Sequence, residues 1–305
     1  MKTLRIATRR SALALWQANH VRDLLMTAHP GLDVELVKIV TKGDRIVDRP
    51  LSEIGGKGLF LKELEASLLA GETDLAVHSM KDMPAEMPDG LDLVAALPRA
   101  NPFDAWISNN GATLEELPAG ARVGTSSLRR RCQVLAARPD LDVVELRGNV
   151  DTRLAKLDAG EYDAIILACA GLERLGLDDR VTAELAPPHF LPAATQGIIG
   201  LQCRTADGPV LEAIAPLADQ GAMIQATAER TVMARLEGSC QVPLAARAVL
   251  DGGSISMIGL VGTPDGKRIL RAAVQGTDPV ATGLALADEL IAQGAEAIIA
   301  DLSRH

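Results

Sequence analysis

The chain has 305 residues, of which 48% are hydrophobic and 2% aromatic. This length and apolar content predict a sizeable core divided between two or three domains. The net charge of −9 argues against a general binder of nucleic-acid phosphates, and the scarcity of aromatic side chains argues against base stacking. An anion site must therefore be a local concentration of arginine and lysine.

The sequence carries no signal for a targeting segment or a membrane span. The stretch MKTLRIATRRSALALWQ has charges inside its apolar part and no small-residue cleavage site, and no apolar run approaches the roughly 20 residues of a membrane-spanning helix. We expect a cytoplasmic protein with no membrane partner and no nucleic-acid partner. The four cysteines are scattered without a C-x-x-C pair, which favours neither a zinc site nor a disulfide framework, so no metal is expected.

The first hundred residues alternate strand-like and helix-like runs. Strand-like runs occupy 4–8, 33–40 and 74–79, and helix-like runs occupy 11–28 and 58–71. This alternation is typical of an α/β sheet covered by helices. It starts again after residue 111, which predicts a second α/β unit.

From about residue 222 the pattern changes. A helix-like run at 222–236 precedes three strand-like runs and a last helix-like run, at 243–250, 254–262, 268–275 and 279–293. Strands that are grouped together and flanked by helices predict a small α+β third domain.

The segment VHSMKDMP, residues 77–84, places Lys81 and Asp82 just after a strand-like run. Pro84 disfavours helix at the residue before it, and the carboxyl ends of strands are where open α/β sheets bind ligands. A carboxylate beside a lysine can stabilise a nearby cation or pass a proton. A solvated ion pair at the strand end is an equally open alternative. His78, on the strand, is expected to be a packed or hydrogen-bonded core histidine.

Hydroxyl and arginine residues follow another strand-like run in VGTSSLRRR, residues 123–131. Thr125, Ser126 and Ser127 are placed to cap the helix-like run behind them, where free N–H groups and the helix dipole favour an anion. Successive helix residues are about 100° apart, so the arginines at 129–131 cannot all point the same way. We expect two to face a cleft and one to face water.

A further turn repeats this arrangement in LRGNVDTRL, residues 146–154, where Gly148 permits a tight turn between Arg147 and Arg153. Residues 122–156 hold eight basic and four acidic residues, net +4, so the rest of the chain carries −13. This contrast favours a site for carboxylates or phosphates over a solvated arginine face.

The segment IATRRSALALWQ has the same order of strand, hydroxyl, arginine and helix, with Arg9 and Ser11 at the turn, and predicts a facing anion site. The glycine-rich stretch GGKGLF, residues 55–60, lacks the spacing of a nucleotide-binding loop. With the weakly patterned residues 41–57, it predicts a hinge or a mobile cover over a cleft.

The cysteines differ in their surroundings. Cys132, Cys169 and Cys203 lie in apolar segments and are expected in the core, whereas EGSCQVP places Cys240 among turn-forming residues that favour exposure. For Cys240 the sequence leaves open both a functional and a structural role of the thiol. No metal-binding pattern accompanies this residue.

Taken together, IATRRSALALWQ, GGKGLF, VHSMKD, VGTSSLRRR, LRGNVDTRL, LPAATQGIIG and LEGSCQVP resemble the porphobilinogen deaminase family, in the same order along nearly the whole chain. The resemblance implies an α/β fold with two domains like the type II periplasmic binding proteins and a small α+β carboxyl-terminal domain with a three-stranded antiparallel sheet. The implied domains are 1–97 with 198–215, 102–192, and 220–305. The return of the chain to the first domain is implied by the resemblance alone.

The resemblance also implies an activity. Members of the family condense four porphobilinogen molecules head to tail with loss of ammonia, on a covalent dipyrromethane primer, and release the linear tetrapyrrole hydroxymethylbilane. The resemblance puts the primer thioether on Cys240 and the catalytic aspartate at Asp82, and it suggests a monomer. The implied carboxylate-binding and polar cleft residues are Arg9, Ser11, Gln17, Lys81, Thr125, Ser127, Arg129, Arg130, Arg147 and Arg153, and the implied covering-loop residues are Lys57 and Phe60.

Elementary chemistry agrees with these roles. Loss of ammonia from an aminomethylpyrrole leaves a cation that a buried carboxylate stabilises, and each added pyrrole brings an acetate and a propionate that need cationic partners. One departure is Ser239, where the family usually has glycine, at a cost of roughly 1 kcal/mol if that position needs a positive φ. A non-catalytic binder of small polyanions and a cysteine hydrolase are the two alternatives.

Overall fold

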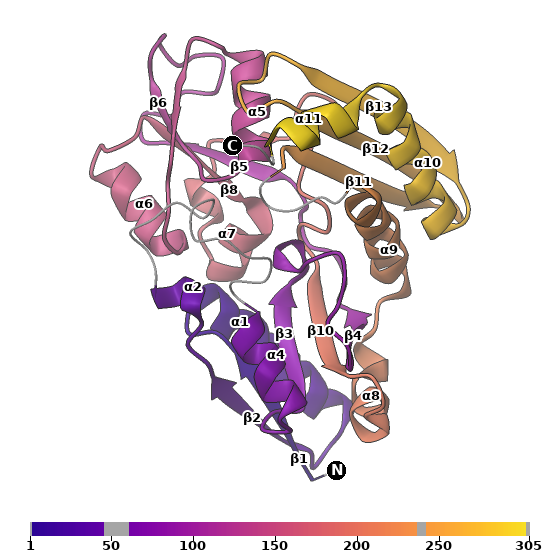
Figure 1. Ribbon diagram of the computed structural model, residues 1–305. Helices are drawn as coiled ribbons and strands as arrows, with labels where there is room; N and C mark the ends of the chain where they lie inside the picture. Colours follow the sequence, from indigo (N-terminus) through magenta and orange to yellow (C-terminus); the bar gives the residue numbers. More distant parts are fainter. Residues whose placement is uncertain (1, 46–60, 237–241, 303–305) are drawn as a thin grey trace.

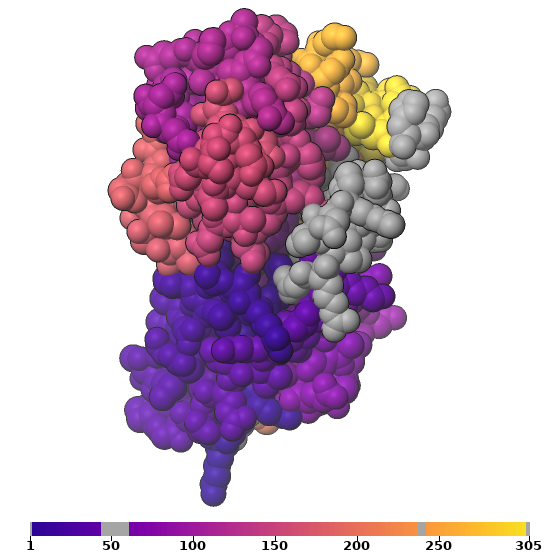
Figure 2. Space-filling view, turned by 90° about the vertical axis from the view of Figure 1, so that its left-hand side faces the viewer, coloured from indigo at the N-terminus to yellow at the C-terminus, as the bar shows by residue number. Residues whose placement is uncertain are grey.

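The computed structural model describes residues 2–45, 61–236 and 242–302. These residues form three units, each built on one sheet (Figure 1). The first and second units lie end to end, and the third lies beside the second. A view from the side shows the same stacking, with the N-terminal unit below the second unit (Figure 2).

The first sheet has the strand order β2-β1-β3-β10-β4. Its strands are β1 (Thr3–Thr8), β2 (Asp33–Lys38), β3 (Leu75–Ser79), β4 (Leu91–Ala96) and β10 (Ile199–Arg204). β1 runs parallel to β2 and β3, whereas β10 runs antiparallel to both β3 and β4. The helical segments of this unit are α1 (Ala12–Ala28), α2 (Lys42–Arg45), α4 (Lys62–Leu69), α8 (Gly208–Ile214) and η3 (Ala215–Leu217).

The second sheet repeats this topology with the order β7-β6-β8-β5-β9. Its strands are β5 (Asp104–Ser108), β6 (Arg122–Gly124), β7 (Asp142–Val144), β8 (Ala164–Ala168) and β9 (Ala183–Leu185). β6 runs parallel to β7 and β8, whereas β5 runs antiparallel to both β8 and β9. The helical segments are α5 (Leu128–Ala137), α6 (Val150–Asp158), α7 (Cys169–Leu175) and η2 (Asp178–Arg180).

Each sheet receives its antiparallel strand from a crossing of the chain. β5 follows β4 of the first sheet and enters the second, and β10 follows β9 of the second sheet and returns to the first. The chain therefore crosses between the sheets twice. The first crossing, residues 97–103, precedes β5, and the second crossing, residues 193–198, precedes β10. This is the return to the first unit that the resemblance implied, while the domain limits themselves stay a prediction.

The third unit is an antiparallel sheet of three strands in the order β11-β12-β13. The strands are β11 (Leu244–Asp251), β12 (Ser254–Gly262) and β13 (Ile269–Gly276), and the helices are α9 (Gln220–Arg235), α10 (Pro279–Ala292) and α11 (Ala295–Leu302). Apolar side chains of both the strands and the helices share one core, as the alternation of apolar residues along the strands requires. The three strands, α9 and α10 follow the sequence-based prediction, whereas α11 was not predicted.

A buried ion pair joins the third unit to both crossings. Glu229 on α9 is fully buried and pairs with Arg99 of the first crossing at 2.6 Å. Its carboxylate also accepts the backbone N–H groups of Thr195, in the second crossing, and Ala248, on β11. One carboxylate thus fixes the position of the crossings relative to the third sheet.

Candidate active site

The turn after β3 presents the first pair of predicted site residues. It is a 3-10 turn, η1 (Met80–Asp82), closed by a hydrogen bond from the Met83 N–H to the Met80 carbonyl. Met80 and Met83 are each only 1% exposed, so they anchor the turn, whereas Asp82 is exposed. Met83 is extended, as expected for a residue before proline.

The start of α5 presents the second group. Ser127 is the N-cap and its hydroxyl accepts the Arg130 N–H at 3.4 Å, while the Thr125 hydroxyl accepts the Ser127 N–H at 3.2 Å. Arg129 and Arg130 are 5% and 6% exposed, and Arg131 is exposed. Two of the three arginines thus turn inward and one faces water, while the cleft that the two were expected to face stays a prediction.

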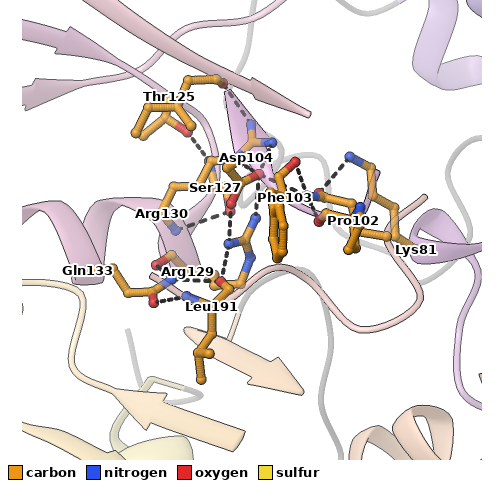
Figure 3. A network of polar contacts seen from close by, with 12 residues as sticks. Lys81, Pro102, Phe103, Asp104, Thr125, Ser127, Arg129, Arg130, Gln133 and Leu191 are labelled. Carbon is orange, nitrogen blue, oxygen red and sulfur yellow. Dashed lines mark hydrogen bonds and ion pairs between the residues drawn. The ribbon is translucent and has the colours of Figure 1, made fainter. Parts of the chain in front are cut away.

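Asp104, at the start of β5, holds these two arginines (Figure 3). Arg129 Nη1 lies 2.6 Å from Asp104 Oδ2, and Arg130 Nη2 lies 2.7 Å from Asp104 Oδ1. Burial alone would raise the pKa of the Asp104 carboxyl, but the two guanidinium groups outweigh burial and hold this pKa well below its usual range. The buried carboxylate therefore stays ionised and serves as the counter-ion of both arginines.

The arginine–aspartate cluster was not predicted as such. Asp104 lies in RANPFDAWISNNG, which reads as the boundary between two α/β units, and its partners lie 25 and 26 residues further on. The available signal was a charged residue at the head of an apolar strand-like run, because a charge there requires a buried partner.

Backbone carbonyls fix the two guanidinium groups further. Arg129 Nη1 also donates to the Leu191 carbonyl at 2.6 Å, and Arg130 Nη1 donates to the Ile166 carbonyl at 2.7 Å. Charge-assisted hydrogen bonds of this kind hold the planar groups in one orientation. The two arginines are thus rigid parts of the second unit.

The turn after β7 presents the third group. Gly148 makes the predicted tight turn with φ +116°, and because a Cβ there would lie 2.8 Å from Thr152, this turn requires glycine. Arg153 donates from Nε to the Gly148 carbonyl at 2.7 Å. Burial first, and the charge of Arg130 second, lower the pKa of Arg153 to about 10.

Charged residues of the first and second sheets shift one another's pKa values across the boundary between the sheets. Asp82 raises the pKa of Arg153, while Arg130 lowers the pKa of Lys81. Burial is the largest cause of the Lys81 shift, which brings its pKa to about 8. Lys81 and Asp82 are therefore close enough to Arg130 and Arg153 for their charges to interact, while their membership of one binding site stays a prediction.

The other predicted site residues of the first unit lie at the ends of its strands and helices. Ser11 caps α1 and accepts the Ala14 N–H at 3.4 Å, and Gln17 donates to the Ser79 hydroxyl at 2.8 Å. Arg9 lies between β1 and α1, close enough to contribute to the lowered pKa of His78.

His78 is buried, and its Nε2 lies 2.9 Å from Gln202 Oε1. Burial is the main cause that lowers its pKa to about 4. The prediction of a hydrogen-bonded core histidine is confirmed.

Lys57, Phe60 and Cys240 lie outside the described residues. The other three cysteines are buried, and burial raises the pKa of Cys132 to about 12, of Cys169 to about 12 and of Cys203 to about 11. These values make them poor nucleophiles, so the prediction of core cysteines holds.

The described part of the chain holds neither a cluster of metal-binding side chains nor a helix that could span a membrane. Within residues 2–45, 61–236 and 242–302, no three or more histidine, cysteine, aspartate and glutamate side chains gather closely enough to hold a metal ion. Within the same ranges, every helix is too short or too polar to cross a membrane.

The fold and the site together define a class. The two doubly wound sheets that exchange a strand have the fold of the type II periplasmic binding proteins, and basic side chains gather where the two sheets meet. A family model described as "Porphobilinogen deaminase, dipyromethane cofactor binding domain" matches residues 4–212, and a model described as "Porphobilinogen deaminase, C-terminal domain" matches residues 223–292. The chain belongs to the porphobilinogen deaminase family.

The activity follows from the family. The chain is a transferase of porphyrin biosynthesis that condenses four porphobilinogen molecules head to tail, with loss of ammonia, on a covalently bound dipyrromethane cofactor. It releases the linear tetrapyrrole hydroxymethylbilane. This assignment replaces both alternatives raised by the sequence, the non-catalytic polyanion binder and the cysteine hydrolase.

Several solved structures are similar to this chain. The BvgS VFT2 domain of Bordetella pertussis has 16% identity, 70% of this chain and 84% of that chain covered, and a TM-score of 0.41. A lipoprotein of the YaeC family from Enterococcus faecalis has 12% identity, 78% and 98% covered, and a TM-score of 0.43. The periplasmic aliphatic sulphonate binding protein SsuA from Escherichia coli has 12% identity, 79% and 72% covered, and a TM-score of 0.41.

The residues present fit a dipyrromethane. This group carries acetate and propionate side chains, which require fixed hydrogen-bond donors with positive charge. Arg147 Nη1 is buried and has no hydrogen-bond partner in the described part of the chain. A buried N–H without an acceptor is costly, and a ligand carboxylate would satisfy it.

Proposed function

We propose that Asp82 is the catalytic carboxylate and that the basic residues at the boundary between the first two sheets bind the carboxylates of the cofactor and substrate. One observation carries this proposal. Lys81 and Asp82 share one turn of the first sheet, and Arg130 and Arg153 of the second sheet interact electrostatically with them. An exposed carboxylate thus lies among cations that neutralise the ligand.

Asp82 suits the chemical step. When ammonia leaves the aminomethyl carbon of porphobilinogen, positive charge develops on the pyrrole that remains. A preorganised carboxylate stabilises that charge in the transition state, where such electrostatic effects are largest. The anchored turn holds Asp82 in place, because the buried side chains of Met80 and Met83 lie on either side of it.

The remaining assignments concern binding. Cys240 holds the cofactor through a thioether, and Lys57 and Phe60 cover the cleft. When bound, the dipyrromethane supplies the pyrrole carbon to which each new unit is joined. The residues that hold carboxylates or support the cleft are Arg9, Ser11, Gln17, Lys81, Thr125, Ser127, Arg129, Arg130, Arg147 and Arg153. The rigid contacts of Ser11, Gln17, Ser127 and Arg129 within their own units support positioning roles for these four.

Two further assignments are proposals of the same kind. A cytoplasmic monomer without nucleic-acid or membrane partners agrees with the net charge of −9 and with the small-molecule substrate of the family. Hydroxymethylbilane synthase is the enzyme name that we assign to this activity.

Replacing Asp82 tests the proposed function. Asp82→Asn keeps the shape of the side chain but removes its charge, so we expect kcat to fall by a factor of about 10² to 10³ while the cofactor stays attached. Steady-state turnover with porphobilinogen and intact mass of the same preparation measure both quantities.

The matched control is Asp89→Asn. Asp89 is an exposed aspartate of the same unit that precedes β4, and β4 is parallel to β3, so Asp89 lies at the opposite end of the sheet from Asp82. We expect the control to turn over like the unmodified protein. Near-normal turnover of Asp82→Asn would remove Asp82 from its catalytic role.

A further inference from the structure

Gln196, in the second crossing, is a node between the two sheets. It is 1% exposed. Its Oε1 accepts a hydrogen bond from Lys81 Nζ at 3.1 Å, and its Nε2 donates to Asp104 Oδ1 at 3.0 Å and to the carbonyls of Pro102 and Phe103 at 2.7 and 3.1 Å. One amide side chain thus contacts the turn of the first sheet, the first crossing and the buried carboxylate of the second sheet.

The backbone around Gln196 is held on both sides. The Gln196 carbonyl accepts a hydrogen bond from Arg99 Nε at 2.9 Å. Gly197 has φ +92°, and a Cβ there would lie 2.5 Å from the Ala100 carbonyl oxygen, so the two crossings touch at this point. Before it, the Thr195 N–H is bound by the buried Glu229 carboxylate. The amide of Gln196 therefore has little freedom to move.

Lys81 depends on this amide for its orientation. In the described part of the chain, the Lys81 ammonium donates its hydrogen bond to Gln196 Oε1. The charged groups that act on Lys81 are the anions Asp82 and Asp104 and the cations Arg129 and Arg130. The anions attract the ammonium and the cations repel it, so these charges oppose one another. The directional hydrogen bond to Gln196 therefore sets the orientation of the ammonium.

We propose that Gln196 is a positioning residue of the condensation reaction, which holds the Lys81 ammonium at a fixed place beside the Asp104 cluster so that it meets a substrate carboxylate already oriented. The proposal rests on the proposed role of Lys81 in carboxylate binding. It assigns to the second crossing a part in substrate recognition, beyond its role as a connection between domains.

Two consequences follow if Gln196 orients Lys81. Without the amide, substrate binding loses a preorganised cation, so KM rises more than kcat falls. The hydrogen bond also stabilises the protonated amine, so its loss lowers the pKa of Lys81 from about 8. Because the charged ammonium is the binding form, the alkaline limb of kcat/KM moves to lower pH.

The test compares Gln196→Met with Gln133→Met. Methionine is close in size to glutamine and makes no such hydrogen bonds. Gln133 is also a buried glutamine, whose amide bonds to the Arg129 and Leu191 backbones and not to Lys81, so it controls for the loss of a buried amide. The measurements are KM and kcat for porphobilinogen, the pH profile of kcat/KM, and the pH dependence of reductive methylation of Lys81, followed by peptide mass.

For Gln196→Met we expect KM to rise about tenfold, the size of one lost hydrogen bond to a charged group, with a smaller change in kcat. The alkaline limb and the methylation midpoint of Lys81 both move to lower pH. Gln133→Met leaves both midpoints in place. Unchanged midpoints in Gln196→Met, or equal shifts in the two variants, overturn the proposal.

Two further variants keep the outcome decisive. If Gln196→Met does not fold, Gln196→Asn, which keeps the amide one methylene short of Lys81, is measured by the same methylation profile, and an unshifted profile overturns the proposal. Lys81→Met separates this proposal from the proposed function. An unchanged KM in Lys81→Met removes Lys81 from substrate binding. The methylation profiles of Lys81 in the unmodified protein and in Gln196→Met report on the Gln196–Lys81 contact in either case.

Discussion

At the scale of single residues, the site depends on one buried carboxylate as much as on its cations. Asp104 is fully buried and binds Arg129, Arg130 and Gln196. A buried charge that loses its partner is strongly destabilising, because desolvation is no longer offset. Asp104 is therefore a stability determinant as well as the counter-ion of the site.

Asp104→Asn should lower the free energy of unfolding by about 3–5 kcal/mol, since it leaves two buried guanidinium groups without an anion. Urea denaturation at pH 7 measures this. The control is Asp142→Asn, whose ion pair with Arg122 is 4.0 Å long and exposed, and which should cost less than about 1 kcal/mol. Equal losses in the two variants would contradict the role given to Asp104.

The same variant has a pH signature. The folded-state pKa of Asp104 is depressed, so its stabilisation is fully present above the unfolded-state pKa, near 3.9, and is lost as pH falls through the folded-state pKa. The stability difference between the unmodified protein and Asp104→Asn should therefore be constant near neutral pH and shrink only in strong acid.

Residue-scale prediction from sequence succeeded where the signal was local. The turn at Lys81 and Asp82, the cap at Ser127 and the glycine requirement at Gly148 depend on neighbours within a few positions. Asp104 and Gln196 escaped prediction because their partners are distant along the chain: the Gln196–Lys81 contact spans 115 positions. No local pattern records such a contact.

At the scale of elements, the two crossings are the most constrained part of the backbone. Gly197 lies where they touch, and its carbonyl also accepts a hydrogen bond from Arg174 Nη2 at 2.7 Å. A side chain at this position would have to push the two crossings apart. The spacing of Gln196 from Lys81 and Asp104 therefore depends on this glycine.

Gly197→Ala should lower the free energy of unfolding by about 1–3 kcal/mol more than Gly120→Ala, measured by thermal or urea denaturation. Both glycines have positive φ, +92° and +78°, so both pay the backbone cost, but a Cβ at Gly120 has nothing within 4 Å. The difference therefore reports the clash with Ala100 alone. Equal losses would contradict the close contact of the crossings.

Element prediction failed at β4, β5, β9 and β10. β4, β5 and β10 are short and partly or wholly buried, so they lack the alternation of apolar and polar residues that reveals a half-exposed strand. Their place in a sheet is set by pairing with strands far away in sequence. The amphipathic α1 and the three strands of the third unit, of which β13 alternates most clearly, were predicted within a few residues.

At the scale of the whole molecule, the third unit contacts both of the others. Arg271 donates to the carbonyls of Pro188 and His189 in the second unit, at 2.6 and 2.9 Å. On the other side, Arg230 on α9 donates to the carbonyl of Ala85, just after the turn that carries Lys81 and Asp82, at 2.7 Å. The helix that leads toward Cys240 is thus fixed against the unit that carries Asp82.

Sequence periodicity alone predicted two α/β units and an α+β unit, but read the first as continuous in sequence. The exchange of β5 and β10 is a property of the assembled sheets, so only the resemblance to the family anticipated the return of the chain. The cationic character of residues 122–156 was visible in the charge count, because that imbalance is large in an acidic chain.

The measurement that tests the account most directly is the intact mass of freshly purified, active protein under denaturing conditions, followed by mapping of the modified peptide. The account predicts a mass above the bare 305-residue chain by two pyrrole units, with the adduct on the peptide that contains Cys240 and absent from Cys240→Ser. A bare-chain mass in active protein, or an adduct on another residue, would contradict it.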